Sequence, residues 1–407
     1  MFTTLIAFFA VLGILVLVHE AGHFFVARYF KVKVEEFGFG LPPRLFGVRL
    51  LPAKQPEAKE ANPAAAPAKR WQFVWGKKNA GQNEAGTIYS LNWIPLGGFV
   101  KIKGEEGEGK GEKDSFVSQS IWRRILIISA GVSMNIILAA IFLTFSLGIG
   151  SPQVIEDQVL PKLARVSDIQ IRIMEVLPET PAAQAGIMAG DSVLEVDGQN
   201  FTEIEALRQY FNQKVGIPVN LKIKRDKAVL EKTATPIILA ETKAGGIGMA
   251  LVKTGFISYP WYAAGYYGTI ETFKMAGGVI YGFYSIIKNL IVSQQMIGEV
   301  YGPIGIAGLV GDATRMGLLY LLQFTAVLSI IIAVINFLPF PALDGGRVFF
   351  LLIEAVRRKP VNQQVENLIH NIGFALLMLL LLLVTFRDLF RLSSGFINWW
   401  GKVGGLF

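Results

Sequence analysis

The 407-residue sequence contains no cysteine, only three histidines and few charged residues. The missing cysteines exclude disulfide bonds, thiolate metal sites and a cysteine nucleophile. Charged residues make up 17% of the chain, whereas 52% of its residues are hydrophobic. Together with the positive mean hydropathy of +0.45, this composition indicates a membrane protein rather than a large soluble enzyme.

The formal net charge of +8 raises the question of nucleic-acid binding. The Lys and Arg residues, however, are scattered around apolar segments and form no aromatic-rich basic face. We therefore attribute the positive charge to membrane topology. The expected surroundings are a lipid bilayer, and no nucleic-acid partner is expected.

Four segments approach the roughly 20 apolar residues needed to cross a bilayer. They are residues 2–25, 121–149, 318–338 and 368–386. The sequence therefore predicts a polytopic α-helical membrane protein with about four transmembrane helices. The first segment has no basic residues before it and runs directly into His19, so we interpret it as a retained span rather than a signal peptide.

Basic residues predict the orientation of these spans, because cytoplasmic loops carry an excess of Lys and Arg. They cluster after the first span, before the second, and between the last two: Arg28, Lys31, Lys33, Arg123, Arg124, Arg347, Arg357, Arg358 and Lys359. Arg387 and Arg391, beyond the fourth span, argue mildly for the opposite orientation. The majority predicts that both termini and residues 151–317 lie outside the cytoplasm.

Three segments around the spans have distinct patterns. Residues 52–70 are rich in Pro, Ala, Lys and Glu without apolar periodicity, which predicts a flexible segment in a cytoplasmic insertion that spans 52–86. The stretch "GTIYSLNWIPLGGFVKIKGEE" alternates apolar and polar residues in two runs split by a proline and two glycines, a pattern typical of a β-hairpin. Residues 256–317 are apolar but interrupted by glycines and charges, so we expect interfacial amphipathic helices on the outer face.

Between about 165 and 252 the pattern is that of an α/β module. It predicts a short helix from about Pro181, a strand over 192–196 between two glycine-containing turns, an amphipathic helix and an alternating strand. The signature from Gly190 to Gly198, Gly-Asp-x-Val-Leu-x-Val-Asp-Gly, resembles that of a PDZ domain. The expected organisation is a membrane core over 1–150, one PDZ domain over 151–255, interfacial helices over 256–317, and the last two spans with a C-terminal tail over 318–407.

The sequence "HEAGH" ends the first predicted span. His19 and His23 are four residues apart, so on a helix both imidazoles share one face and can bind a single metal ion. Glu20 lies next to them, where a carboxylate can act as a general base. Placing ionisable residues within an apolar span costs free energy, which favours a functional interpretation of these residues. Neutral imidazoles suit zinc, and a catalytic zinc site has three protein ligands and an open position.

The third ligand must come from elsewhere in the chain. The candidates are carboxylates and the one remaining histidine, His370, which we otherwise interpret as a polar interfacial residue. Asp344 is the stronger candidate, because Pro339 and Pro341 break the helix just before it and would turn its side chain inward. The alternative for Asp344 is a simple turn or helix-capping residue before Gly345.

These motifs together resemble the site-2 protease family of intramembrane zinc metalloproteases. They are His19 to His23, Gly131 to Asn135, "GPIGIA" at 302–307 and "NFLPFPALDG" at 336–345. The interposed PDZ module makes the chain most similar to the RseP (regulator of sigma-E protease) type. The resemblance covers nearly the whole chain. It differs in two features, since the RseP type carries two PDZ modules and the 52–86 insertion is longer than expected.

The resemblance implies roles for individual residues. His19, His23 and Asp344 would bind zinc, Glu20 would be the catalytic base, and Asn135 and Asn336 would help to position the substrate. The "LGGFVKIKGE" stretch is similar to the membrane-associated β-loop of the family, which is thought to hold the unwound substrate as an added strand.

The resemblance also implies an activity and a location. The activity would be regulated intramembrane proteolysis in a bacterial inner membrane, with the active site toward the cytoplasm and the PDZ domain outside. Substrates would be single-pass membrane proteins, such as anti-sigma factors already trimmed by a site-1 protease, or signal-peptide remnants.

Two other functions fit parts of the sequence. The chain could be a catalytically inactive PDZ-bearing membrane scaffold. An inactive member of the family would be expected to lose the catalytic base, so the intact Glu20 argues against this alternative. A transporter would use the intramembrane His, Glu and Asp residues as a path, but it calls for broken helices in an internal repeat, and the sequence shows none.

Overall fold

A computed structural model describes residues 2–51, 70–76, 86–105, 107–155, 163–225, 228–239, 243–292 and 301–404. The chain divides into two compact units. The helical unit contains Met1–Phe142, Ile270–Arg315 and Phe324–Phe407, and the α/β unit contains Leu143–Thr269 and Met316–Gln323. Each unit is described by itself.

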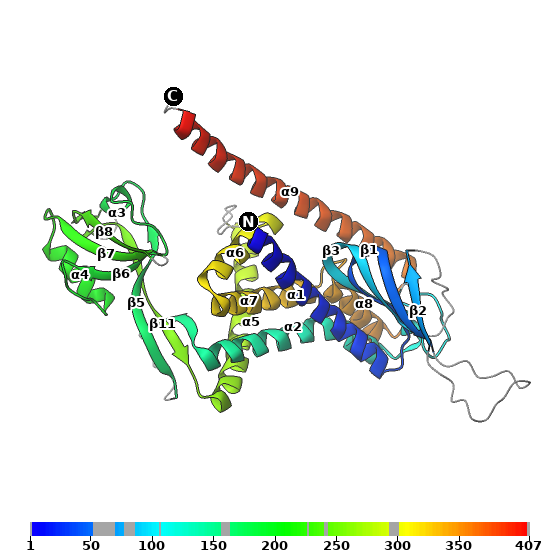
Figure 1. Cartoon of the computed structure of the whole chain (residues 1–407). Coiled ribbons are helices and arrows are strands. Elements are labelled where there is room, and N and C mark those ends of the chain that lie inside the picture. The colour runs from blue at the N-terminus through cyan, green and yellow to red at the C-terminus, as the bar shows by residue number, and fades with distance from the viewer. Residues whose placement is uncertain are drawn as a thin grey trace, which may run out of the picture. The chain divides into compact units, whose positions relative to one another are not determined.

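The long helices of the chain are labelled in Figure 1. They are α1 (Phe2–Tyr29), α2 (Ile121–Ile149), α5 (Trp261–Val292), α6 (Pro303–Met316), α7 (Leu318–Phe337), α8 (Asp344–Arg357) and α9 (Gln363–Gly404). Within the described residues, four helices are long and apolar enough to cross a membrane: Thr3–Tyr29, Ile121–Ile149, Leu318–Phe337 and Gln363–Phe390. The four predicted spans are therefore confirmed as helices, and α9 extends well beyond the predicted 368–386. The interfacial location of α5 and α6 remains a prediction.

The helical unit also contains a three-stranded sheet in the order β2-β1-β3. Its strands are β1 (Val34–Leu51), β2 (Arg70–Trp75) and β3 (Ile88–Ile102). Phe37 of β1 pairs with Val100 and also with Tyr89, so the first half of β1 lies between the two alternating runs of β3. The structure thus differs from the expected hairpin, because both runs pair with the long preceding strand.

The strand β2 lies within the predicted insertion over 52–86. Its alternation explains why residues 70–75 are ordered as a strand rather than a flexible segment: Val74 is buried, while Trp71, Phe73 and Trp75 are exposed on the other face. Of the segment predicted to be flexible, 52–70, only Arg70 belongs to this strand. Residues 52–69 and 77–85 lie outside the described part of the chain.

The α/β unit is built on a six-stranded sheet in the order β4-β11-β5-β6-β7-β8. Its elements are β4 (Ser151–Val154), β5 (Arg165–Val176), α3 (Pro181–Gln184), β6 (Ser192–Val196), α4 (Ile204–Gln213), β7 (Val219–Arg225), β8 (Ala228–Ala234), β9 (Ile237–Ile238), β10 (Gly245–Gly246) and β11 (Met249–Ser258). The predicted helix from Pro181, the strand over 192–196 and the amphipathic helix are confirmed. Apolar residues from β5, β6, β7 and α4 form its core.

Two features of the helical unit bring α1, α2 and α8 together. A buried apolar cluster joins Phe24 of α1, Ile127 of α2 and Val348 of α8. The chain also breaks between α7 and α8, where the two prolines predict it, so that α8 begins at Asp344. Gly345 lies so close to the preceding loop that a Cβ there would come within 2.3 Å of the carbonyl oxygens of Phe337 and Leu338.

Candidate metal centre

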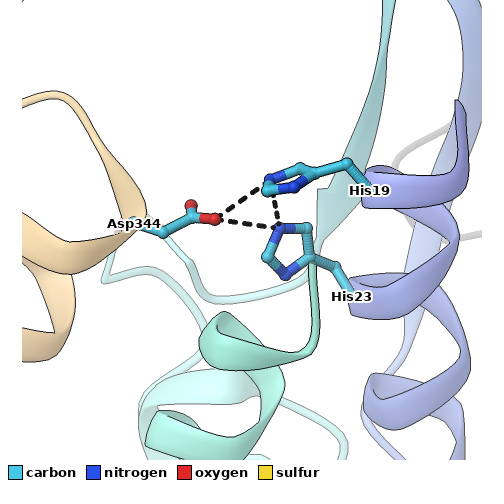
Figure 2. Close-up of side chains that lie close together, drawn as sticks. All are labelled: His19, His23 and Asp344. Carbon is cyan, nitrogen blue, oxygen red and sulfur yellow. Dashed lines mark hydrogen bonds and ion pairs between the residues drawn. The ribbon is translucent and has the colours of Figure 1, made fainter. Parts of the chain in front are cut away.

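Three ligand atoms converge between α1 and the start of α8. Figure 2 shows His19 and His23 extending from α1 toward Asp344. The Nε2 atoms of the two histidines are 3.3 Å apart, and Asp344 Oδ2 lies 3.0 Å from His19 Nε2 and 3.4 Å from His23 Nε2. Both histidines are 7% exposed. The structure therefore brings together the three residues for which the sequence predicts metal binding.

The other nitrogen of His23 fixes the tautomer of this ring. His23 Nδ1 lies 2.9 Å from the carbonyl oxygen of Ile127 in α2. A carbonyl oxygen can only accept a hydrogen bond, so Nδ1 carries the proton and donates it. In the neutral ring Nε2 then presents its lone pair toward Asp344. Metal-bound histidines are held in this way by a partner on the second nitrogen.

Asn135 makes the corresponding contact to His19. Its Nδ2 lies 3.4 Å from His19 Nδ1, the residue is fully buried, and its Oδ1 has no hydrogen-bond partner among the described residues. The nitrogen and oxygen of an amide are assigned from their partners, and exchanging the two places Oδ1 against His19 Nδ1 as an acceptor. This orientation satisfies the buried oxygen and leaves His19 Nε2 free to bind a metal. Ser329 of α7 donates a 2.8 Å hydrogen bond to the backbone carbonyl of Asn135 and so fixes its position.

Two glycines allow α1 and α2 to meet at the rings. A Cβ at Gly22 would come within 2.3 Å of the carbonyl oxygen of Ala130. A Cβ at Gly131 would lie 2.5 Å from His23 Nε2 and 2.8 Å from His19 Nε2. Only glycine leaves room at residue 131 for two imidazoles with metal-binding nitrogens. Sequence reasoning recognised Gly131 as the start of a motif but could not predict this contact, which depends on how the two helices pack.

Glu20 lies between the histidines and the sheet. Its carboxylate lies close enough to the backbone of Val100 in β3 for an electrostatic interaction with it. The Cβ position of Gly98 lies 3.6 Å from Glu20 Cγ, so β3 passes directly beside this side chain. The carboxylate is thus held next to the histidines and next to a strand, as a base acting on a bound peptide requires.

The remaining predicted residues lie around this group. Asn336 is in the last turn of α7 and is half-buried, and its side chain has no hydrogen-bond partner among the described residues. His370 does not belong to the group of three ligand atoms. It lies on α9 and accepts a hydrogen bond from the backbone N–H of Ala342, at 2.9 Å.

The three residues fit a zinc ion. Asp344 Oδ2 is buried and has no hydrogen-bond donor within the described part of the chain, although it faces two imidazole nitrogens. A carboxylate oxygen beside two lone pairs is poorly satisfied unless a cation lies among them. Ligand atoms around a four-coordinate zinc with bonds of about 2.0–2.1 Å lie about 3.3 Å apart, close to the separations found here.

Comparison with known proteins gives the family. The model of peptidase family M50 matches residues 7–54 and 62–380. The chain therefore belongs to peptidase family M50, the family of site-2-type metalloproteases. The predicted family resemblance is confirmed.

Curated relatives match over nearly the whole chain. A protein of Clostridium perfringens is 32% identical over 381 residues, which cover 92% of this chain and 95% of that protein. The zinc metalloprotease RasP of Bacillus licheniformis is 28% identical, covering 96% of this chain and 99% of the relative. The regulator of sigma-W protease RasP of Bacillus subtilis is 27% identical with the same coverage of both chains.

Solved structures match a smaller part of the chain. The PDZ domain of the SdrC-like protein from Listeria monocytogenes is 26% identical, with a TM-score of 0.20. The match covers 21% of this chain and 92% of the Listeria domain.

Proposed function

We propose that this protein is an intramembrane zinc metalloprotease that hydrolyses peptide bonds within the transmembrane segments of single-pass membrane proteins. The convergence of His19, His23 and Asp344 beside Glu20 is the observation that carries the proposal. These three residues would hold a zinc ion, which would supply Lewis-acid chemistry for the scissile carbonyl and for the attacking water. Two relatives carry protease names, and both are bacterial, which supports an inner-membrane location.

Glu20 would move the proton in this reaction. Its carboxylate accepts the proton of the attacking water and passes it to the leaving amine. Asn135 holds His19 through Nδ1, and the Ile127 carbonyl holds His23, so neither ring can turn during the reaction. Asn336, half-buried at the end of α7, would donate or accept a hydrogen bond with the substrate backbone.

The sheet offers a place for the unwound substrate. Within the described residues, the second run of β3 pairs with β1 on one edge and has no strand on the other. A peptide added to that edge would form main-chain hydrogen bonds and lie next to Glu20, because the backbone of β3 at Gly98 and Val100 passes beside its side chain. A transmembrane helix must unwind before its carbonyls can be attacked, and strand addition would stabilise the unwound form.

The proposed orientation rests on the basic residues of the sequence, and the proposed substrate class rests on the resemblance to the family. The basic clusters favour an active site toward the cytoplasm and an α/β unit outside. We propose that the α/β unit is a PDZ module that either binds a newly exposed substrate C-terminus or admits only substrates already trimmed of their outer domain, after a first cleavage outside the membrane by a separate site-1 protease. Anti-sigma factors and signal-peptide remnants are substrates of the required kind. The alternative, an inactive scaffold, is disfavoured by the intact Glu20.

The test compares wild-type protein with Glu20→Gln, purified in detergent. We expect about one zinc per chain in both proteins, and cleavage of a tagged single-span substrate by the wild type alone, because the amide cannot accept the proton. Glu271→Gln is the matched control, since this carboxylate on α5 lies outside the metal centre and forms only a 4.0 Å ion pair with Lys274. Absence of zinc from the wild type, or full activity of Glu20→Gln, would overturn the proposal.

A further inference from the structure

The loop between α7 and α8 sets the position of Asp344. It contains Pro339 and Pro341, and Ala342 adopts a φ of 75°. An L-residue rarely adopts this left-handed conformation, and it persists only where the surrounding structure holds it. Asp344 follows two residues later as the first residue of α8. Whatever holds Ala342 therefore also holds the carboxylate that faces the two histidines.

His370 of α9 holds this backbone directly. The N–H of Ala342 donates a hydrogen bond of 2.9 Å to His370 Nδ1. A backbone N–H can only donate, so Nδ1 must be the acceptor and the neutral ring carries its proton on Nε2. An amide or hydroxyl partner could either donate or accept, but a backbone N–H only donates, so the protonated nitrogen of this ring is fixed. The ring also packs against Phe350 of α8, with centroids 5.6 Å apart.

A second residue on the same face of α9 also packs against the loop. Gly373, three residues after His370, lies so close to Pro341 that a Cβ would come within 2.4 Å of Pro341 Cβ and 2.7 Å of its carbonyl oxygen. His370 and Gly373 thus contact two consecutive residues of the loop, Ala342 and Pro341. On its other side, His370 lines a polar cavity of about 690 Å³ bounded by α2, α8, α9 and the segment after β3.

We infer that His370 is a positioning residue for the metal centre. By accepting the Ala342 N–H it keeps the loop in the conformation that points Asp344 toward His19 and His23. It does not touch the three ligand atoms, so it acts through the backbone and not on the substrate. This inference rests on the proposed function, because it assigns His370 to the metal site proposed there. It also replaces the sequence-based interpretation of His370 as a polar interfacial residue.

Two substitutions separate the hydrogen bond from the packing of the ring. His370→Phe keeps an aromatic ring against Phe350 but removes the acceptor. His370→Asn removes the ring but places an amide oxygen near the position of Nδ1. Asn371→Leu is the matched control, because Asn371 is exposed, lines the same cavity and follows directly on the same helix, yet its side chain makes no hydrogen bond within the described residues.

The measurements are zinc affinity, by competition with a chelator, and hydrogen exchange of the 338–343 backbone in metal-free protein. We expect His370→Phe to weaken zinc binding about tenfold or more and to speed exchange in the loop, as for other residues that orient metal ligands. His370→Asn and Asn371→Leu should stay close to wild type in both measurements. Exchange in metal-free protein reports the loop even if the Phe variant holds no zinc.

Three results would overturn the inference. They are unchanged zinc affinity in His370→Phe, unchanged exchange in the loop of that variant, and an Asn variant as impaired as the Phe variant. The last result would assign the role to ring packing. These failures differ from failure of the proposed function, in which wild-type protein itself binds no zinc.

Discussion

Gly131 of α2 lies against the imidazole of His23, so close that a Cβ at residue 131 would come within 2.5 Å of His23 Nε2. The same Cβ would lie 2.8 Å from His19 Nε2. The positions of the two nitrogens that face Asp344 therefore depend on the absence of a methyl group at residue 131 of α2. This relationship connects helix packing to metal binding.

The first prediction concerns Gly131→Ala. Alanine stabilises a helix by about 1 kcal/mol relative to glycine, so the substitution should not destabilise α2 as a helix. The added methyl must displace both rings, and we expect zinc affinity to fall about tenfold or more, with loss of cleavage. The measurement is chelator competition on purified protein.

The control for this substitution is Gly148→Ala on the same helix. A Cβ at Gly148 would meet its nearest neighbour at 3.9 Å, an ordinary van der Waals contact. Zinc affinity should therefore stay at the wild-type level in this variant. If Gly131→Ala also bound zinc as tightly as wild type, the close contact would have no functional meaning.

A second prediction concerns the buried amide of Asn135. Asn135→Leu removes the acceptor proposed for His19 Nδ1–H, so His19 can adopt the tautomer that protonates Nε2 and blocks metal binding. Asn135→Asp keeps an acceptor and forms the carboxylate–histidine pair common around zinc. We expect zinc to dissociate about 10–100-fold faster from the Leu variant and no faster than wild type from the Asp variant.

The control for Asn135 lies two residues earlier on the same helix. Ser133→Ala removes an exposed hydroxyl that bonds only to the Ser129 carbonyl of its own helix. It should leave zinc dissociation unchanged. Rapid dissociation from the Asp variant as well as the Leu variant would show that shape, and not an acceptor, is what residue 135 provides.

The three candidate metal ligands were largely predictable because their signals are local. The spacing of His19 and His23 places both rings on one helix face, and the prolines before Asp344 predict the break that turns this residue inward. The contacts that orient these ligands are not local. Asn135 is separated from His19 by 116 residues, and no sequence spacing indicates which helices will meet.

The β1–β3 sheet was predicted less well for a related reason. Alternation identifies strands but not their partners, and a long strand can pair with two segments at once, as the first half of β1 does. The aromatic alternation of β2 was present in the sequence, but the surrounding low-complexity segment obscured it. The contact between His370 and the loop was missed because the bond involves the backbone of Ala342, which leaves no trace in side-chain patterns.

A third prediction tests the core of the α/β unit. Asp191 is 1% exposed and accepts two 2.7 Å hydrogen bonds from Arg225, together with one from the Met188 N–H. Asp191→Ala leaves a partly buried guanidinium and a backbone donor without this partner, which should destabilise the unit by about 3 kcal/mol. Because the chain lacks cysteine, a dye on Glu205→Cys, an exposed residue of α4, can report urea unfolding of this unit in the full protein.

Glu195→Ala is the matched control for Asp191→Ala. Like Asp191, Glu195 is an acidic residue of the α/β unit that pairs with a basic residue of β7. Its 3.5 Å contact to Lys222, however, is solvent-exposed. Its loss should change stability by less than about 1 kcal/mol. Equal effects of the two substitutions would contradict the difference in burial on which the prediction depends.

The last prediction concerns pH and the second aspartate of the Gly190–Gly198 signature. The backbone N–H of Asn220 and the hydroxyl of Tyr210 donate hydrogen bonds of 2.8 and 2.7 Å to the Asp197 carboxylate. These bonds, the one from Asn220 most of all, hold the pKa of Asp197 below its ordinary value. A carboxyl with a lower pKa in the folded state stabilises that state above the unfolded pKa of about 3.9, and the stabilisation is lost as the pH falls through the folded value.

The α/β unit should therefore lose stability below about pH 4, and Asp197→Asn should remove part of that loss, because an amide does not titrate. Asn can still accept the Asn220 N–H, so at neutral pH the variant should remain folded. The measurement is the urea midpoint of the labelled unit between pH 3 and 7, in wild type and variant. Parallel pH profiles for the two proteins would show that Asp197 contributes no pH dependence, and the acid sensitivity would then belong to other carboxylates.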